Sequence, residues 1–120
     1  MLISAIALLS AAELAGIGLC CFYLLERPIR GWSRLGSAAH GLAGTAGAAL
    51  TGLAVFGGAR DPQNFGHLAI YAFAATLALA LVIIGAQLRR RRPPGLAVAI
   101  HATVGMAALI VLLAYASIPA

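Results

Sequence analysis

The chain contains no lysine, and its 120 residues carry few charges of any kind. Only 9% of the residues are charged and only three are acidic, whereas every one of the eight basic residues is an arginine. Soluble domains are about 25% charged and about 45–50% apolar, so a chain that is 62% hydrophobic does not have the composition of a water-soluble globule. The same composition excludes intrinsic disorder, which requires low hydrophobicity and many charges.

Chemistry-bearing motifs are also scarce. The only two cysteines, Cys20 and Cys21, are adjacent, and neighbouring cysteines are poorly placed for a structural disulfide. No phosphate-binding loop, nucleophile triad or zinc motif is present in the sequence. The arginines cluster between apolar segments, which is typical of membrane orientation rather than nucleic-acid binding. The sequence therefore predicts a lipid bilayer, and no nucleic acid, as the main partner.

The chain contains long apolar runs. A helix that spans a bilayer needs about 20 mostly apolar residues. Four stretches meet this requirement, at about residues 2–25, 35–56, 67–88 and 95–118. The short breaks between them contain glycine, proline, asparagine and aspartate, the usual residues of turns. The sequence predicts an all-α membrane protein with a single four-span domain, an up-down-up-down four-helix transmembrane bundle that two tandem helical hairpins would generate.

The distribution of arginine predicts the orientation of this bundle. The first break carries three arginines and the third carries four (Arg27, Arg30 and Arg34; Arg89–Arg92). The second break holds only Arg60, beside Asp61. The positive-inside rule places the first and third breaks in the cytoplasm, so both termini would be periplasmic in a bacterial inner membrane. The first span lacks a basic leading region and a convincing cleavage site, and we expect it to be retained.

The two halves of the chain contain similar sequence segments. The segments HGLAG and HATVG share a His-x-x-x-Gly pattern: His101 lies 61 residues after His40, and Gly105 lies 61 residues after Gly44. An arginine-rich break precedes each of these segments. A tandem duplication of one helical hairpin accounts for this spacing.

Histidine inside a membrane span is costly, and it marks a functional site by default. His40 and His101 lie about five and six residues inside the second and fourth spans, at a depth of roughly 7–9 Å below the same boundary. These spans are diagonal partners in the predicted bundle, so the two imidazoles would meet in its interior. Equal depth and imidazole chemistry predict bis-histidine ligation of one haem b, with Gly44 and Gly105 leaving room for the flat macrocycle. Arg30, Arg34 or the Arg89–Arg92 run would receive the haem propionates.

In helix number and in these two motifs, the chain resembles the four-helix transmembrane b-type cytochromes, including the cytochrome b561 group. The resemblance implies axial ligation by His40 and His101 and an activity in electron transfer, with a quinone or a larger respiratory complex as partner. Many such cytochromes hold two haems. His67 has no second in-membrane histidine at its depth, so we expect a single haem. The absence of a Cys-x-x-Cys-His motif predicts that the haem is not covalently attached.

Glu13 supports a different hypothesis, because an ionised carboxylate near the middle of a span is expensive. Its segment AAELAGIG resembles the first helix of the small multidrug resistance transporters, in which a glutamate binds the proton and the cationic drug. This resemblance implies a proton-coupled transporter that works as a homodimer. The third span lacks the tryptophan of that family, and buried histidines are not part of its pattern.

The remaining polar residues leave further alternatives open. His67 and Tyr71 lie at the outer start of the third span, where they serve either as interfacial anchors or, with Arg60 and Asp61, as a proton or quinone site. We expect Tyr23, Trp32 and Tyr115 at the membrane interfaces. Helix faces rich in small residues also suit a structural or assembly subunit of a larger membrane complex, in which the histidines only pack.

Overall fold

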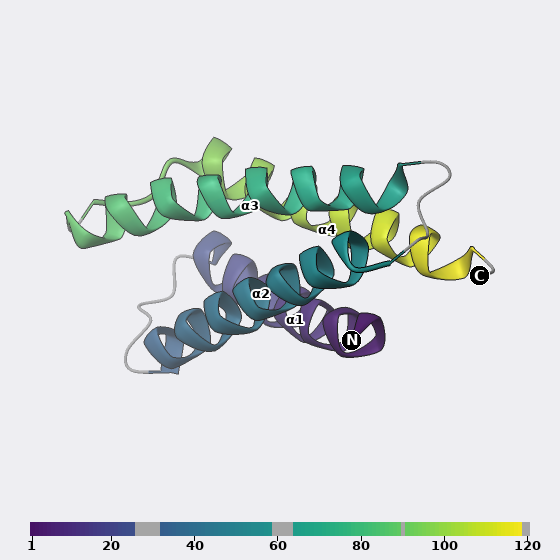
Figure 1. Ribbon diagram of the computed structural model, residues 1–120. Coiled ribbons are helices and arrows are strands. Elements are labelled where there is room, and N and C mark those ends of the chain that lie inside the picture. The colour runs from purple at the N-terminus through teal and green to yellow at the C-terminus, as the bar shows by residue number, and fades with distance from the viewer. Residues whose placement is uncertain (26–31, 59–63, 90, 119–120) are drawn as a thin grey trace.

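Four α-helices account for nearly all of the chain. The computed structural model describes residues 1–25, 32–58, 64–89 and 91–118, with residues 32–34 described by their backbone alone. The helices are α1 (Leu2–Leu24), α2 (Trp32–Phe56), α3 (Phe65–Leu88) and α4 (Gly95–Ser117), as Figure 1 shows. The part of the chain that the structure describes contains no strand. The predicted all-α class and four-span organisation are therefore confirmed.

Each helix is long and apolar enough to cross a membrane. The observed bounds lie within three residues of the predicted spans, and the largest difference is the start of α2 at Trp32. Before α3, Asn64 adopts a left-handed backbone with φ of 57°, a conformation that asparagine tolerates better than most residues. Before α4, Pro93 and Pro94 lack the N–H group that would continue a helix, so the chain turns there.

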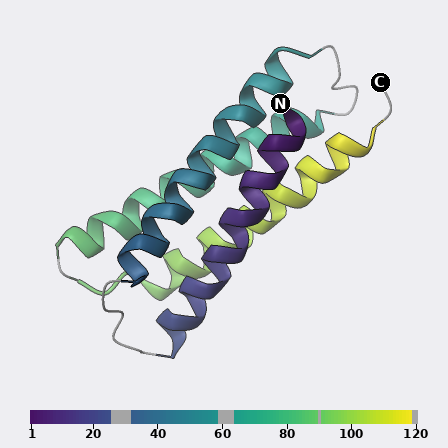
Figure 2. The same ribbon diagram turned by 90° about the horizontal axis from the view of Figure 1, so that it is seen from below.

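The helices form two antiparallel hairpins, with α1 packed on α2 and α3 packed on α4. Less extensive contacts of α1 with α4 and of α2 with α3 close the bundle, so α2 and α4 are diagonal partners. The start of α1 and the end of α4 lie at the same end of the bundle as the end of α2 and the start of α3 (Figure 2). We call this the terminal end. The opposite end, where α1 and α3 finish and α2 and α4 begin, is called the arginine end.

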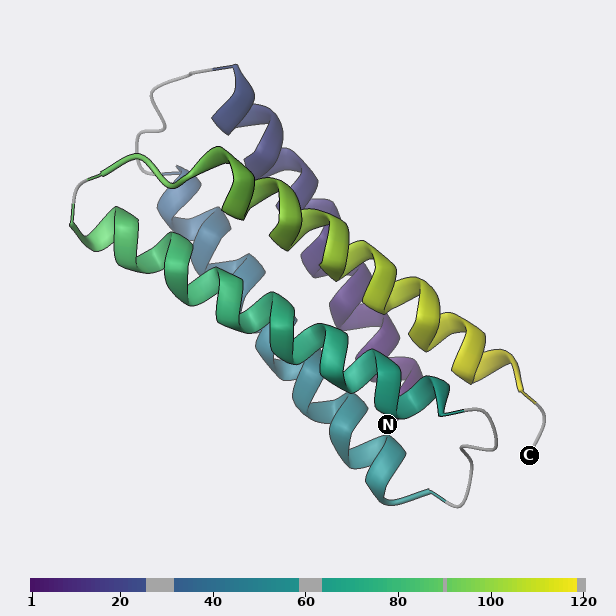
Figure 3. The ribbon, with the colours of Figure 1, turned by 90° about the horizontal axis from the view of Figure 1, so that it is seen from above.

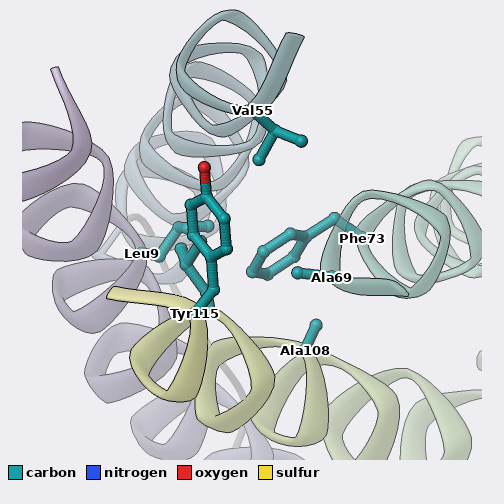
Figure 4. Close-up of a cluster of buried hydrophobic side chains, with 7 residues drawn as sticks. Leu9, Val55, Ala69, Phe73, Ala108 and Tyr115 are labelled. Carbon is teal, nitrogen blue, oxygen red and sulfur yellow. The ribbon is translucent and has the colours of Figure 1, made fainter. Parts of the chain in front are cut away.

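The packed core lies in the half of the bundle near the terminal end. All four helices contribute to it, and its members are buried (Figure 4): Leu9, Val55, Ala69, Phe73, Ala108, Leu112 and Tyr115. Tyr115 lies in the last turn of α4 and is only 6% exposed, because α4 turns its ring toward α2 (Figure 4). Its expected place at a membrane interface stays a prediction.

Close approach of α1 and α2 depends on a glycine. A Cβ at Gly47 would lie 2.6 Å from Cγ of Leu9 and 3.3 Å from the carbonyl oxygen of Ala5. One turn later, the buried Thr51 donates its hydroxyl hydrogen to the carbonyl of Gly47 over 2.9 Å, which satisfies a polar group inside the bundle. Small residues of this kind let membrane helices pack tightly, because lipid supplies little hydrophobic driving force between them.

The two hairpins bury equivalent positions. In α1 and α3 the buried residues repeat with a spacing of 64, as Ala5 with Ala69 and Leu9 with Phe73. In α2 and α4 the spacing is 61, and the fully buried Thr51 matches the fully buried Leu112. The similarity of the halves therefore extends from the two short motifs to the register of packing.

We expect Gly47→Ala to lower the free energy of unfolding by up to about 2 kcal/mol, because overpacking costs about 1–3 kcal/mol and the gain in helix propensity offsets about 1 kcal/mol of it. The measurement is thermal unfolding in detergent, followed by far-ultraviolet circular dichroism. Gly52→Ala is the control on the same helix, since a Cβ there meets nothing within 4 Å. Equal effects of the two substitutions would contradict the packing described above.

Candidate functional site

The structure brings His40 of α2 and His101 of α4 together inside the bundle. Their ring centroids are 5.9 Å apart and their planes cross at 74°, an edge-to-face arrangement. Both side chains are half-buried. Two diagonal helices therefore meet through their histidines, at the same depth and with the rings turned inward.

Each imidazole also makes a hydrogen bond to the first helix of its own hairpin. Nδ1 of His40 lies 2.7 Å from the carbonyl oxygen of Ala12, and Nδ1 of His101 lies 2.9 Å from the carbonyl oxygen of Thr76. A carbonyl only accepts hydrogen bonds, so Nδ1 must carry the proton in both rings. In the neutral imidazole this leaves the lone pair on Nε2, the tautomer that a metal-binding histidine needs.

The carbonyl partners of the two histidines are themselves equivalent. Thr76 follows Ala12 by 64 residues, the same spacing that relates the buried positions of α1 and α3. Both halves thus use one arrangement, in which a histidine of the second helix donates to a main-chain carbonyl of the first. These carbonyl partners could not be predicted from the sequence, because every residue has a backbone carbonyl.

The two glycines that follow the histidines contact α1. A Cβ at Gly44 would lie 3.8 Å from Cβ of Ala12, which is an ordinary contact. A Cβ at the buried Gly105 would lie only 2.7 Å from Oε1 of Glu13. The space beside Gly105, expected to leave room for a flat macrocycle, holds the Glu13 carboxyl group, because α1 packs against α4.

A cavity of about 430 Å³ occupies the half of the bundle toward the arginine end. All four helices line it, and most of the lining is apolar. Its polar lining residues include Glu13, His40 and His101, together with Tyr23 and Gln87 nearer the arginine end. Seen from above, the α3–α4 hairpin lies over the α1–α2 hairpin (Figure 3), and the cavity is lined by residues of both. The core and the cavity therefore divide the bundle into a packed half and an open half.

Contacts around Tyr23 join the hairpins at the arginine end. Its hydroxyl group donates to the carbonyl of Pro93 over 2.9 Å. The guanidinium carbon of Arg92 lies 4.9 Å from the centre of the Tyr23 ring, within the range of a cation–π interaction. Tyr23 thus connects the last turn of α1 to the link between α3 and α4, beyond the anchoring role expected from the sequence.

The structure describes the predicted arginines only in part. Arg30, Arg60 and Asp61 lie outside the described residues, and of Arg34 only the backbone is described. Arg89 and Arg91 are exposed at the arginine end. Arg92 alone, among the arginines with described side chains, has a described contact with a residue that lines the cavity.

His67 and Tyr71 are not part of the cavity. With Asn64 and Leu68 they line a shallow pocket of about 360 Å³ at the start of α3. The His67 ring makes an edge-to-face contact with Phe56, with centroids 5.6 Å apart, and Tyr71 is 69% exposed. His67 is about 14 Å along the helix axis from the level of Thr76, so the structure does not bring these residues together with Glu13.

Cysteine and carboxylate groups do not complete a metal site around the histidines. Both cysteines are free and both line the cavity, with Cys20 half-buried and Cys21 exposed. Within the described ranges, no group of three or more histidine, cysteine, aspartate or glutamate side chains is arranged to hold a metal ion. In the described part of the chain, any metal held at this place would therefore have the two imidazoles alone from these four residue types.

We expect both His40 and His101 to be protonated on Nδ1 and not on Nε2 when neutral. The measurement is ¹⁵N nuclear magnetic resonance of the detergent-solubilised protein carrying labelled histidine, recorded at a pH where imidazole is uncharged. The His40→Ala and His101→Ala variants assign the signals. Protonation of either ring on Nε2 would be incompatible with the carbonyl contacts of Ala12 and Thr76.

Comparison of the chain with models of known protein families, with curated proteins and with solved structures gives no match. A functional conclusion must therefore come from the site itself. The features that bear on it are the paired imidazoles, their shared tautomer and the apolar cavity around them.

Proposed function

We propose that this chain is an integral membrane haem b protein that transfers electrons, and that His40 and His101 are the two residues that would hold a single haem. The observation that carries the proposal is the matched pair of imidazoles, each with Nδ1 donating to a carbonyl and Nε2 left with its lone pair. A histidine that only packs inside the bundle needs one hydrogen-bond partner, and each of these two rings already has one. Two histidines whose remaining nitrogens are free to bind, in rings 5.9 Å apart, match a site that binds one atom between them.

The distance between the rings agrees with this assignment. The ring centroids are 5.9 Å apart, and a metal–imidazole bond is about 2.0 Å long, so both imidazoles would be within reach of one metal atom after a small adjustment. The crossing angle of 74° is compatible with ligation, because rotation about a metal–nitrogen bond does not change its length.

The protein ligands also indicate which kind of metal centre fits. Two imidazoles leave most coordination positions of an iron ion to be filled, and among the described residues no third histidine, cysteine, aspartate or glutamate is grouped with them to hold a metal ion. A porphyrin fills the four equatorial positions itself and needs an apolar enclosure, which the cavity lining provides. Haem therefore suits this donor set better than a bare metal ion does.

When bound, the haem supplies the one-electron redox chemistry. The chain's own residues orient it and exclude water. The carbonyls of Ala12 and Thr76 hold the imidazoles in one tautomer and increase their basicity as ligands. At the arginine end, Arg92 and the neighbouring arginines offer positive charge to the haem carboxylates.

We further propose that the arginine end faces the cytoplasm, so that both termini are periplasmic in a bacterial inner membrane. The haem would then lie nearer the cytoplasmic surface. A lipid-soluble quinone or another subunit of a respiratory complex is the expected electron partner, since the chain has four apolar helices and short connections. His67 and Tyr71 remain the candidates for a quinone headgroup site at the opposite surface.

The protein purified in detergent from haem-replete cells should show a Soret band, with sharp α and β bands after reduction by dithionite. His40→Ala and His101→Ala should each lose these bands, because one axial ligand disappears. His67→Ala is the matched control, since it removes the third histidine and leaves the cavity unchanged. The measurement is the visible spectrum together with the pyridine haemochrome assay.

Two results would overturn this proposal. One is a colourless wild-type preparation that is fully helical by circular dichroism and that binds no added haemin. The other is a haem spectrum that survives both His40→Ala and His101→Ala.

A second candidate function is proton-coupled transport of a lipophilic cation. The observation that favours it is the place of Glu13, whose carboxyl group lies against Gly105 inside the same cavity. Within the described part of the chain, this carboxyl group makes no hydrogen bond. A carboxylate in an apolar cavity is the group that would exchange a proton for a cation.

Transport by Glu13 would produce cation-dependent proton release, which Glu13→Gln should abolish. The measurement is the pH change of a weakly buffered detergent solution on addition of a lipophilic cation such as tetraphenylphosphonium. If the haem proposal is correct instead, wild type and Glu13→Gln release no protons under these conditions and both keep the haem spectrum.

A further inference from the structure

The His40 ring occupies the space that a side chain at Gly16 would fill. A Cβ at Gly16 would lie 2.9 Å from Cε1 of His40, 3.2 Å from Nδ1 and 3.8 Å from Nε2. All three of the nearest atoms belong to this one imidazole. Gly16 lies one helical turn after Ala12, whose carbonyl accepts the hydrogen bond from the same ring. The ring therefore rests along α1, over Gly16, while it bonds to Ala12.

The other hairpin differs at the equivalent place. The spacing of 64 that relates Ala12 to Thr76 relates Gly16 to Ala80, which carries a Cβ and lines the cavity. The two histidines thus have equivalent carbonyl partners, but only His40 has a glycine beneath its ring. The two halves are therefore not equivalent in how they hold the imidazoles.

We propose that Gly16 is a positioning residue, which sets the orientation of the His40 imidazole and, through it, the angle between the two histidine planes. The effect on the ring is a property of the protein without any cofactor. The consequence for ligand geometry rests on the proposed function.

The physical reason is the rigidity of the atoms involved. A Cβ at 2.9 Å from a ring carbon is closer than real contacts allow, so the imidazole or the helix must move. The ring is a flat, rigid group whose Nδ1 is already held at 2.7 Å from Ala12. A methyl group at position 16 would lift the ring away from α1, which lengthens this hydrogen bond and changes the 74° crossing with His101.

The first test uses the haem-free protein with ¹⁵N-labelled histidine. Gly16→Ala should shift the His40 Nδ1 signal in the direction of a weakened hydrogen bond and leave the His67 signals unchanged. Gly18→Ala is the matched control, because it makes the same substitution on the same helix where a Cβ meets nothing within 4 Å. A His40 spectrum that is identical in Gly16→Ala and in wild type would overturn the proposal.

The wild type provides a test that no folding defect can obscure. A nuclear Overhauser effect is expected between the α protons of Gly16 and the Hε1 proton of His40, since Cε1 is the ring atom closest to the missing Cβ. A well-resolved spectrum in which this effect is absent would show that the ring does not lie over Gly16.

The second test concerns the cofactor. The largest g value in the electron paramagnetic resonance spectrum of ferric low-spin haem depends on the angle between its two axial imidazole planes. We expect this value to change in Gly16→Ala and to stay at the wild-type value in Gly18→Ala. An unchanged g value in a haem-loaded Gly16→Ala protein would contradict the effect on ligand geometry. A wild type without haem would overturn the proposed function, while the nuclear magnetic resonance tests would still decide the role of Gly16.

Discussion

The structure depends most on one hydrogen bond that occurs twice, from the Nδ1 atom of an intramembrane histidine to a carbonyl of the preceding helix. Because a polar ring without a partner is costly in an apolar interior, this bond is what allows His40 and His101 to lie there. It also sets the tautomer, which leaves Nε2 of each ring as an acceptor. The hydrogen bond that allows an imidazole to lie inside the bundle thus also leaves its Nε2 atom able to bind a metal. The proposed function follows from this double effect.

The bundle is divided into a packed half and an open half, and His40 and His101 line the cavity of the open half. Near the terminal end, small residues bring the helices into contact around Phe73 and Tyr115. Toward the arginine end, the cavity opens beside the histidines. Tyr23 still joins α1 to the link between α3 and α4 there, so the two hairpins remain in contact at the arginine end. A rigid half can hold helix positions while the other half accommodates a ligand.

Much of the architecture was predictable from the sequence, because membrane helices have a strong compositional signal. Apolar runs of about 20 residues and turn-forming breaks predicted four helices whose ends the structure places within three residues. The equal depth of His40 and His101 on diagonal spans also predicted that the two would meet. The roles of Gly16 and Tyr115 were not predictable. Alanine and glycine are so frequent in these spans that no periodicity shows which of them faces a neighbouring helix.

The sequence by itself determined the number of helices, their antiparallel order and the depth of the two histidines, because these depend on length, hydropathy and position along the chain. Only the tertiary structure decided which carbonyl each imidazole meets, that Glu13 lies against Gly105 and that the open space lies toward the arginine end. These features depend on how each helix is rotated about its axis. In helices that are apolar on every side, small local contacts settle that rotation, and the amino-acid pattern does not record it.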